Sequence, residues 1–109
     1  MAFAVRIVEL CKYLNEQKNE FVIAKQILRS GTSIGANLRE AIYAETDLDF
    51  IHKLAISQKE CNETMYWLEL LKATNYIKEE QFESLHADAE EIMKMLTASI
   101  LTAKRKLNH

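Results

Sequence analysis

Apolar residues recur along most of the chain at the spacing of α-helices. Phe3, Ile7, Leu10 and Leu14, for example, follow one another at intervals of four, three and four residues, which places them on one helix face. The same criterion indicates four helical segments. We expect them at about Ala2–Gln17, Phe21–Glu45, Thr46–Ala73 and Lys78–Lys106.

Short polar connections separate these segments. Lys18-Asn19-Glu20 joins the first two, Thr46 is a helix N-cap with Asp49 completing a capping box, and Asn75 ends the third segment. Short connections force consecutive helices to run antiparallel. The chain has no proline and two glycines, too few turn formers for a sandwich or barrel. The sequence therefore predicts an all-α, antiparallel up-down-up-down four-helix bundle forming a single domain over residues 1–109.

The third segment is apolar on two sides. Its main stripe runs from Phe50 to Leu71, and a second apolar set lies roughly opposite. This set consists of Ile56, Tyr66, Trp67 and Leu70. A patch that includes the only tryptophan of the chain is unlike a solvated surface. We interpret it as a subunit interface; the alternative is a central helix covered on both sides within one subunit.

The second segment carries a polar stripe that spans an arc of about 80°. The stripe consists of Gln26, Arg29, Ser33, Asn37 and Glu40. Short hydrogen-bonding side chains beside one Arg and one Glu are typical of a polar seam against another helix, with Glu60 and Glu63 as partners of Arg29. The alternative is a solvated face. Gly31 and Gly35 each cost helix stability, which predicts close approach of a neighbouring helix.

Composition and charge limit the kinds of function that the chain can have. The chain has 109 residues and a net charge of −2, so it is not a polycation. The N-terminus lacks the pattern of a signal peptide, and no apolar run is long enough to span a membrane. Cys11 and Cys61 lie far apart without a C-x-x-C motif, as expected for two core thiols in a reducing compartment; a redox pair is the alternative. We expect a cytoplasmic protein with no membrane partner.

Candidate chemistry is sparse. His86 follows Glu83 in one E-x-x-H motif, and a di-iron bundle needs two. His52 and His109 have no partner at metal-binding spacing. We therefore predict no catalytic residue, no metal and no cofactor. Basic residues gather at the end of the fourth segment: Lys104, Arg105, Lys106 and His109. They suit the helix dipole, and they are also the candidate contacts for nucleic acid.

The stretch Gln26–Ala41, QILRSGTSIGANLREA, resembles the signature Q-I-x-R-A-x-x-S-I-x-x-N-I-x-E-G. This is the core motif of the four-helix-bundle family encoded by intervening sequences in bacterial 23S ribosomal RNA genes. Accessory variability determinants of diversity-generating retroelements are similar to it. The second half of the chain matches at Asp49-Phe50, Leu54-Ala55, Glu60, Glu63, Tyr66–Leu71 and Tyr76-Ile77.

The resemblance implies a ring-like homopentamer in which the polar stripe is structural and intersubunit. It also implies contact with nucleic acid and protein partners in the retroelement members, which are basic, whereas this chain is slightly acidic. The resulting prediction is a non-enzymatic, homo-oligomeric scaffold or adaptor. The alternative is a weak, sequence-independent RNA- or DNA-binding protein that uses Lys104, Arg105 and Lys106.

Overall fold

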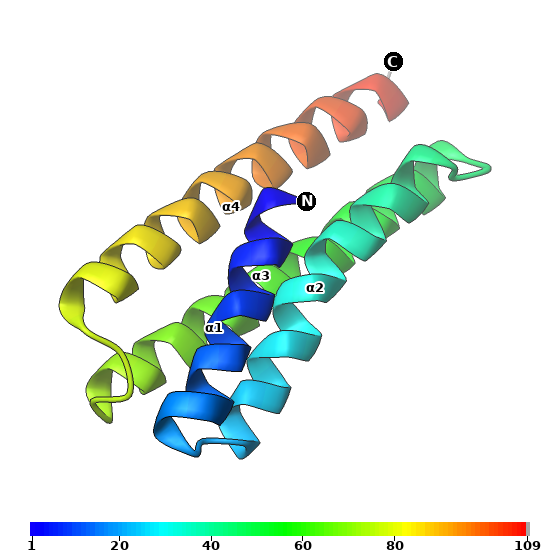
Figure 1. Cartoon of the computed structure of the whole chain (residues 1–109). Helices are drawn as coiled ribbons and strands as arrows, with labels where there is room; N and C mark the ends of the chain where they lie inside the picture. The colour runs from blue at the N-terminus through cyan, green and yellow to red at the C-terminus, as the bar shows by residue number, and fades with distance from the viewer. Residues whose placement is uncertain (109) are drawn as a thin grey trace.

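The computed structural model describes residues 1–108, and within them the chain forms four α-helices and no strand (Figure 1). The helices are α1 (Ala2–Lys18), α2 (Val22–Ile42), α3 (Asp47–Ala73) and α4 (Glu79–Leu107). The predicted four-helix, all-α fold is confirmed. His109 lies outside the described residues.

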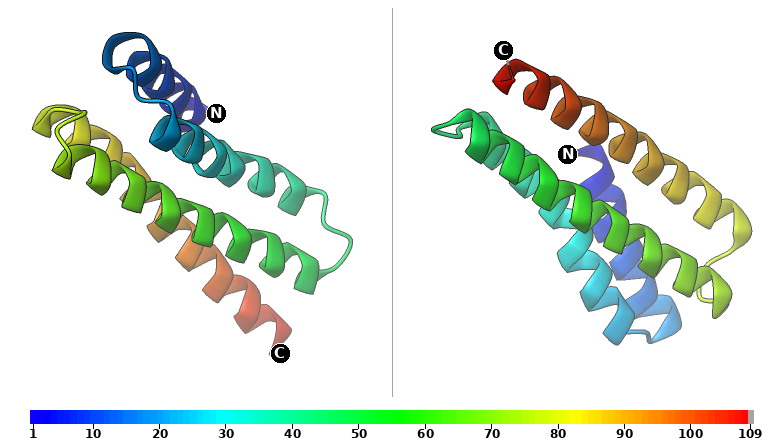
Figure 2. Two further views of the ribbon diagram at one scale, coloured as in Figure 1. Left: turned by 90° about the horizontal axis from the view of Figure 1, so that it is seen from below. Right: turned by 180° about the vertical axis from the view of Figure 1, so that it is seen from behind.

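The four helices differ in length, and this shapes the whole molecule. Helix α1 has 17 residues, whereas α3 has 27 and α4 has 29. We call the end with the α1–α2 and α3–α4 turns proximal, and the end with the α2–α3 corner and the end of α4 distal. Helix α1 starts near the middle of the bundle and covers only its proximal half (Figures 1 and 2). Helix α3 packs against both α2 and α4, and α1 packs mainly on α2.

The first connection is built by two residues that break the helical hydrogen-bond pattern. Asn19 takes a left-handed conformation with φ 52°, and the Glu20 amide donates to the Leu14 carbonyl over 2.9 Å. The Glu20 carboxylate then accepts hydrogen bonds from the amides of Ile23 and Ala24. Glu20 thus caps α2, a role that the sequence pattern did not indicate.

At the α2–α3 corner, the C-terminal end of α2 differs from the prediction, and the start of α3 agrees with it. Helix α2 ends at Ile42, three residues before the expected end at Glu45, because the chain must turn before Thr46 can take the extended conformation of an N-cap. The Thr46 hydroxyl accepts from the Asp49 amide at 3.0 Å, as predicted. At the next turn Asn75 has φ 63°, and Gln81 caps α4 by accepting from the Lys78 amide.

The core consists of two clusters, one in each half. The proximal cluster joins all four helices around Ile7, Leu14, Ile27 and Leu68. The distal cluster joins α2, α3 and α4 around Ile34, Leu54, Cys61, Leu96 and Ile100, with Phe3 of α1 packed against it. No buried polar side-chain atom in residues 1–108 lacks a hydrogen-bond partner. The buried polar side chains described here therefore find their hydrogen-bond partners within the subunit.

Small residues on α2 bring its neighbours close. Gly31 is buried, and a Cβ there would lie 2.8 Å from Cγ2 of Ile7 on α1. One residue earlier, the buried Ser30 hydroxyl accepts from Thr64 of α3 at 2.9 Å. Helix α2 is thus approached from two sides at the same level.

The prediction of close approach is wrong for Gly35 within the subunit. No atom outside the local backbone lies within 4 Å of a Cβ built there, and the residue is exposed. The reason is that Gly35 lies beyond the start of α1, so no fourth helix reaches it.

The two glycines give a matched pair for testing this packing. Gly31→Ala should destabilise the subunit by about 1–3 kcal/mol, because the new methyl group overlaps Ile7. Gly35→Ala should not destabilise the subunit, and replacing an exposed helical glycine stabilises by up to about 1 kcal/mol. Urea unfolding measures both. Equal tolerance of the two alanines would contradict the close α1–α2 contact.

Candidate interaction surfaces

The polar stripe of α2 lies along the outer α2–α3 boundary. Arg29 bridges two carboxylates of α3: one guanidinium nitrogen lies 3.0 Å from Glu60, and the other contacts Glu63. Glu63 also accepts from the indole nitrogen of Trp67 at 3.1 Å. The Arg29 side chain is nevertheless 49% exposed. The network joins α2 to α3 at the surface of the subunit rather than in its interior.

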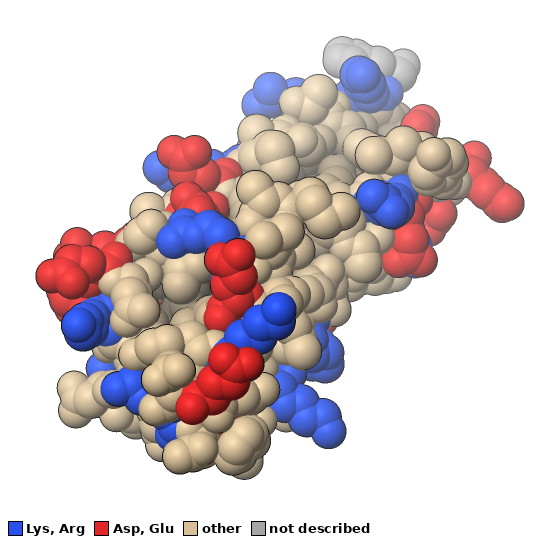
Figure 3. All heavy atoms as spheres, viewed as in Figure 1, with Lys and Arg blue, Asp and Glu red and all other residues tan. Residues whose placement is uncertain are grey.

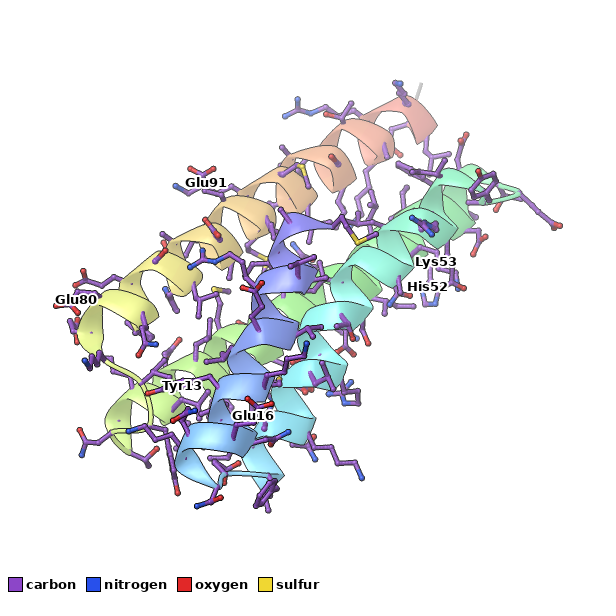
Figure 4. The ribbon with its side chains drawn as sticks, viewed as in Figure 1. Tyr13, Glu16, His52, Lys53, Glu80 and Glu91 are labelled. Atoms are coloured by element: carbon purple, nitrogen blue, oxygen red, sulfur yellow. The ribbon has the colours of Figure 1, made fainter. Side chains whose placement is uncertain are left out.

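The other members of the stripe are arranged less uniformly. Ser33 and Asn37 donate back to carbonyls of their own helix, so their side chains do not bridge to α3. Glu40 lies 3.6 Å from Lys53, which extends from α3 toward the distal half of α2 (Figure 4). Gln26 is exposed. The stripe therefore consists of ion pairs at Arg29 and Glu40 separated by locally bonded side chains.

The second apolar set of α3 flanks this network. Trp67 is half-buried, packs against the proximal cluster and meets Tyr66 edge to face at a ring distance of 5.0 Å. Ile56 and Leu70 are also half-buried, whereas Tyr66 is 56% exposed. Much of the set is thus covered within its own subunit, and Tyr66 is the large side chain that remains in solvent.

A different apolar surface lies in the distal half, where α1 is absent. A groove between α2 and α4 opens beyond the first turn of α1. Its lining residues include Phe3, Ile34, Gly35, Leu38, Ile92 and Met95. The carboxylates Asp88 and Glu91 also line it, and Figure 3 shows few charged side chains over the rest of this face. We call this feature the distal groove.

The α2–α3 corner beside the groove also carries exposed apolar side chains. Ile42 is 75% exposed, Tyr43 80% and Leu48 70%. Neither feature can be recognised from the apolar periodicity of a single helix. The signal was the length difference between the first and fourth predicted segments, which leaves one end of the bundle with a helix missing.

The basic cluster at the end of α4 is exposed but divided. Consecutive residues of a helix lie about 100° apart, so Lys104, Arg105 and Lys106 extend in three directions. Lys106 lines a hollow whose opposite wall contains Asp47, and Asp49 lies in the same first turn of α3. The distal end therefore has a basic side on α4 and an acidic side on α3.

His86 is paired with carboxylates, and the two cysteines are buried. The His86 ring lies between Glu90, 2.7 Å away, and Glu69 of α3, 3.2 Å away, rather than beside Glu83. Burial raises the pKa of Cys11 and Cys61 to about 11, so both thiols stay protonated at neutral pH. Among residues 1–108 no three metal-ligating side chains come together. Nor does any helix there meet the length and hydropathy of a membrane span.

The exposure of Arg29 gives a prediction for the polar network. Arg29→Ala should cost the isolated subunit less than about 1 kcal/mol, since half-exposed ion pairs contribute little. Thr64→Val, which leaves the buried Ser30 hydroxyl without its donor, should cost about 1–3 kcal/mol. Urea unfolding at low protein concentration compares the two. A larger loss of unfolding free energy for Arg29→Ala would show that the network is more deeply buried than its exposure in the single subunit indicates.

Comparisons with known proteins agree with this architecture. A search of curated proteins finds no match. A solved structure from Bacteroides thetaiotaomicron, described as a protein with unknown function from the S23 ribosomal protein family, is 60% identical. The alignment covers 91% of this chain and 88% of that one, with a TM-score of 0.90. The model of the 23S rRNA-intervening sequence protein family matches residues 1–98. The chain therefore belongs to the 23S rRNA-intervening sequence protein family.

Proposed function

We propose that this protein is a non-enzymatic, homo-oligomeric scaffold or adaptor of the cytoplasm. The observation that carries the proposal is the amount of large apolar side chain left in solvent by the single subunit. Ile42, Tyr43, Leu48 and Tyr66 are each more than half exposed, and so is Met95 at 51%. Covering such side chains contributes about 1.5–3 kcal/mol each when burial is complete. Self-association is the arrangement that covers them on every copy.

The distribution of these side chains supports a ring rather than a simple pair. They lie on two separate faces, the outer α3 face with Tyr66 and the distal corner with Ile42 and Leu48. An assembly that joins different faces of successive subunits closes into a ring when the rotation permits. Five subunits is the number implied by the resemblance of Gln26–Ala41 to the family signature. A ring presents one surface several times, which strengthens binding of a protein partner through multivalency.

The assembly is tested by measuring mass in solution. Light scattering coupled to gel filtration should give five times 12.6 kDa at micromolar concentration. Tyr66→Lys should lower the mass if the outer α3 face is an interface, because it places a charge where an apolar contact forms. Lys59→Glu, an exposed change on the same helix, serves as a control. A monomeric wild type would refute the proposed function.

A second candidate function is weak, sequence-independent binding of RNA or DNA. The supporting observation is the exposed basic end of α4, repeated once per subunit in a ring. The accessory variability determinants that the chain resembles bind nucleic acid as well. Opposing this, the net charge of −2 per chain accumulates in an assembly and repels a polyanion at long range. Binding would depend on local contacts within about 8 Å at physiological salt.

Replacing Lys104, Arg105 and Lys106 with glutamine tests this second function. The wild type should retain RNA or DNA only at low salt, because phosphate contacts release counterions. The triple variant should lose that binding while its oligomeric mass stays unchanged. Filter binding across a salt series measures retention. Tight binding by the triple variant would place the nucleic-acid surface elsewhere.

A further inference from the structure

The distal groove continues the space that α1 fills in the other half of the bundle. Within residues 1–108, α2 and α4 do not pack directly on each other, and α1 contacts both of them in the proximal half. Beyond the start of α1 the groove opens between them, with a volume of about 430 Å³. Its walls run from Gly31 to Leu38 on α2 and from Asp88 to Met95 on α4. The groove therefore has the form of a site for a short helix.

Helix α1 shows which chemistry this space accepts. Its apolar stripe, which includes Ile7 and Leu10, is buried in the proximal cluster. On the side that faces α4, the Arg6 guanidinium forms an ion pair with Asp88 and donates a hydrogen bond to the Ser84 hydroxyl over 2.9 Å. The helix that the subunit itself places between α2 and α4 is thus amphipathic, with a basic residue on its α4 flank.

The groove repeats the features that α1 meets, but without an occupant. Leu38 of α2 and Ile92 and Met95 of α4 form apolar surface along it. Asp88 lies where the groove begins, and Glu91 follows one turn further along α4, at the outer rim (Figure 4). Glu91 is exposed and forms no ion pair within residues 1–108. No lysine or arginine lines the groove, so its charged lining favours a basic occupant.

We propose that the distal groove binds an amphipathic helix of a partner protein, with an apolar stripe and a basic residue beside it. The inference rests on the adaptor role proposed above and specifies the chemistry of the partner. The apolar stripe of the partner covers Leu38, Ile92 and Met95, as in other complexes that lay a helix into a groove. Its lysine or arginine pairs with Glu91, in the way that Arg6 of α1 pairs with Asp88.

The surfaces proposed for self-association lie outside this groove. Tyr66 is on the outer α3 face, and Ile42 and Leu48 are at the distal corner. None of these three residues lines the groove. Each copy in an assembly therefore keeps its own groove, and the adaptor presents the same helix site once per subunit.

The test uses two fluorescein-labelled synthetic peptides that differ only in charge. Each has about 14 residues, or roughly four helical turns, with leucines at the spacing of one helix face. One peptide carries arginine beside the leucine stripe, and the other carries glutamate at the same position. Fluorescence anisotropy measures their Kd values. We expect the wild type to bind the arginine peptide about five- to tenfold more tightly, because an exposed ion pair contributes modestly and glutamate adds repulsion.

Substitutions in the groove locate the binding. Glu91→Lys should reverse the preference in favour of the glutamate peptide, whereas Glu83→Lys, the same change of charge at an exposed α4 position outside the groove, should keep the preference for arginine. Gly35→Phe adds a ring where the subunit leaves open space and should weaken binding of both peptides by about tenfold or more. Its control is Ala36→Phe, at an exposed position that does not line the groove. Circular dichroism and urea unfolding establish that each variant keeps its helical fold.

Equal binding of the two peptides, or a folded Gly35→Phe variant that binds them as tightly as the wild type, would overturn the proposal. So would an equal effect of Glu83→Lys and Glu91→Lys, since the preference would then come from net charge. An oligomeric wild type that binds neither peptide would overturn the helix site and leave self-association standing. A monomeric wild type that binds the arginine peptide would refute the assembly alone. A smaller oligomeric mass for Gly35→Phe would identify a second copy as the occupant and overturn the partner helix.

Discussion

The arrangement of the bundle depends on the close packing of α1 and α3 against α2 at Ser30 and Gly31. Gly31 admits Ile7 of α1 on one side, and Ser30 meets Thr64 of α3 on the other. Since a β-carbon at Gly31 would overlap Ile7, α1 could not approach α2 with a larger residue there. The buried hydroxyls at Ser30 and Ser57 donate or accept across the α2–α3 contact, so their polarity is compensated. These contacts hold α1 and α3 against two sides of α2.

The same packing explains why the two halves of the molecule differ. Held against Gly31, α1 covers the proximal cluster and reaches the distal one only through Phe3. Beyond that point α2 continues with Gly35 and Leu38, and α4 continues for several further turns. The proximal half is a closed bundle, and the distal half is a three-helix arrangement with apolar surface in solvent. The proposed self-association would remove exposed apolar side chains of this half from solvent.

The sequence predicted the helices well because each carries its own signals. The spacing of apolar residues located all four, and Thr46 and Asn75 marked their ends through local hydrogen bonding and a left-handed backbone. It did not predict the cap by Glu20, since a glutamate before a helix is common and its bonding depends on the preceding turn. Nor did it predict that Trp67 packs on its own core, because burial is a property of neighbours.

The candidate surfaces were predictable to a different degree. Arg29, Glu60 and Glu63 share a boundary because residues three and four apart stay on one helix face, and that part of the polar stripe follows from spacing. The groove at Gly35 arises from the relative lengths of helices that are distant in sequence, so no single segment reveals it. The basic end of α4 could be recognised in the sequence as a run of three basic residues. Its division around the helix and its proximity to Asp47 needed the three-dimensional arrangement.

Amide hydrogen exchange measured over a range of protein concentrations tests the central claim most directly, because it reports which surfaces become covered on assembly. The account predicts that rising concentration slows exchange at the α2–α3 corner around residues 42–48 and on the outer α3 face around Tyr66. Concentration-independent exchange at both places would contradict it.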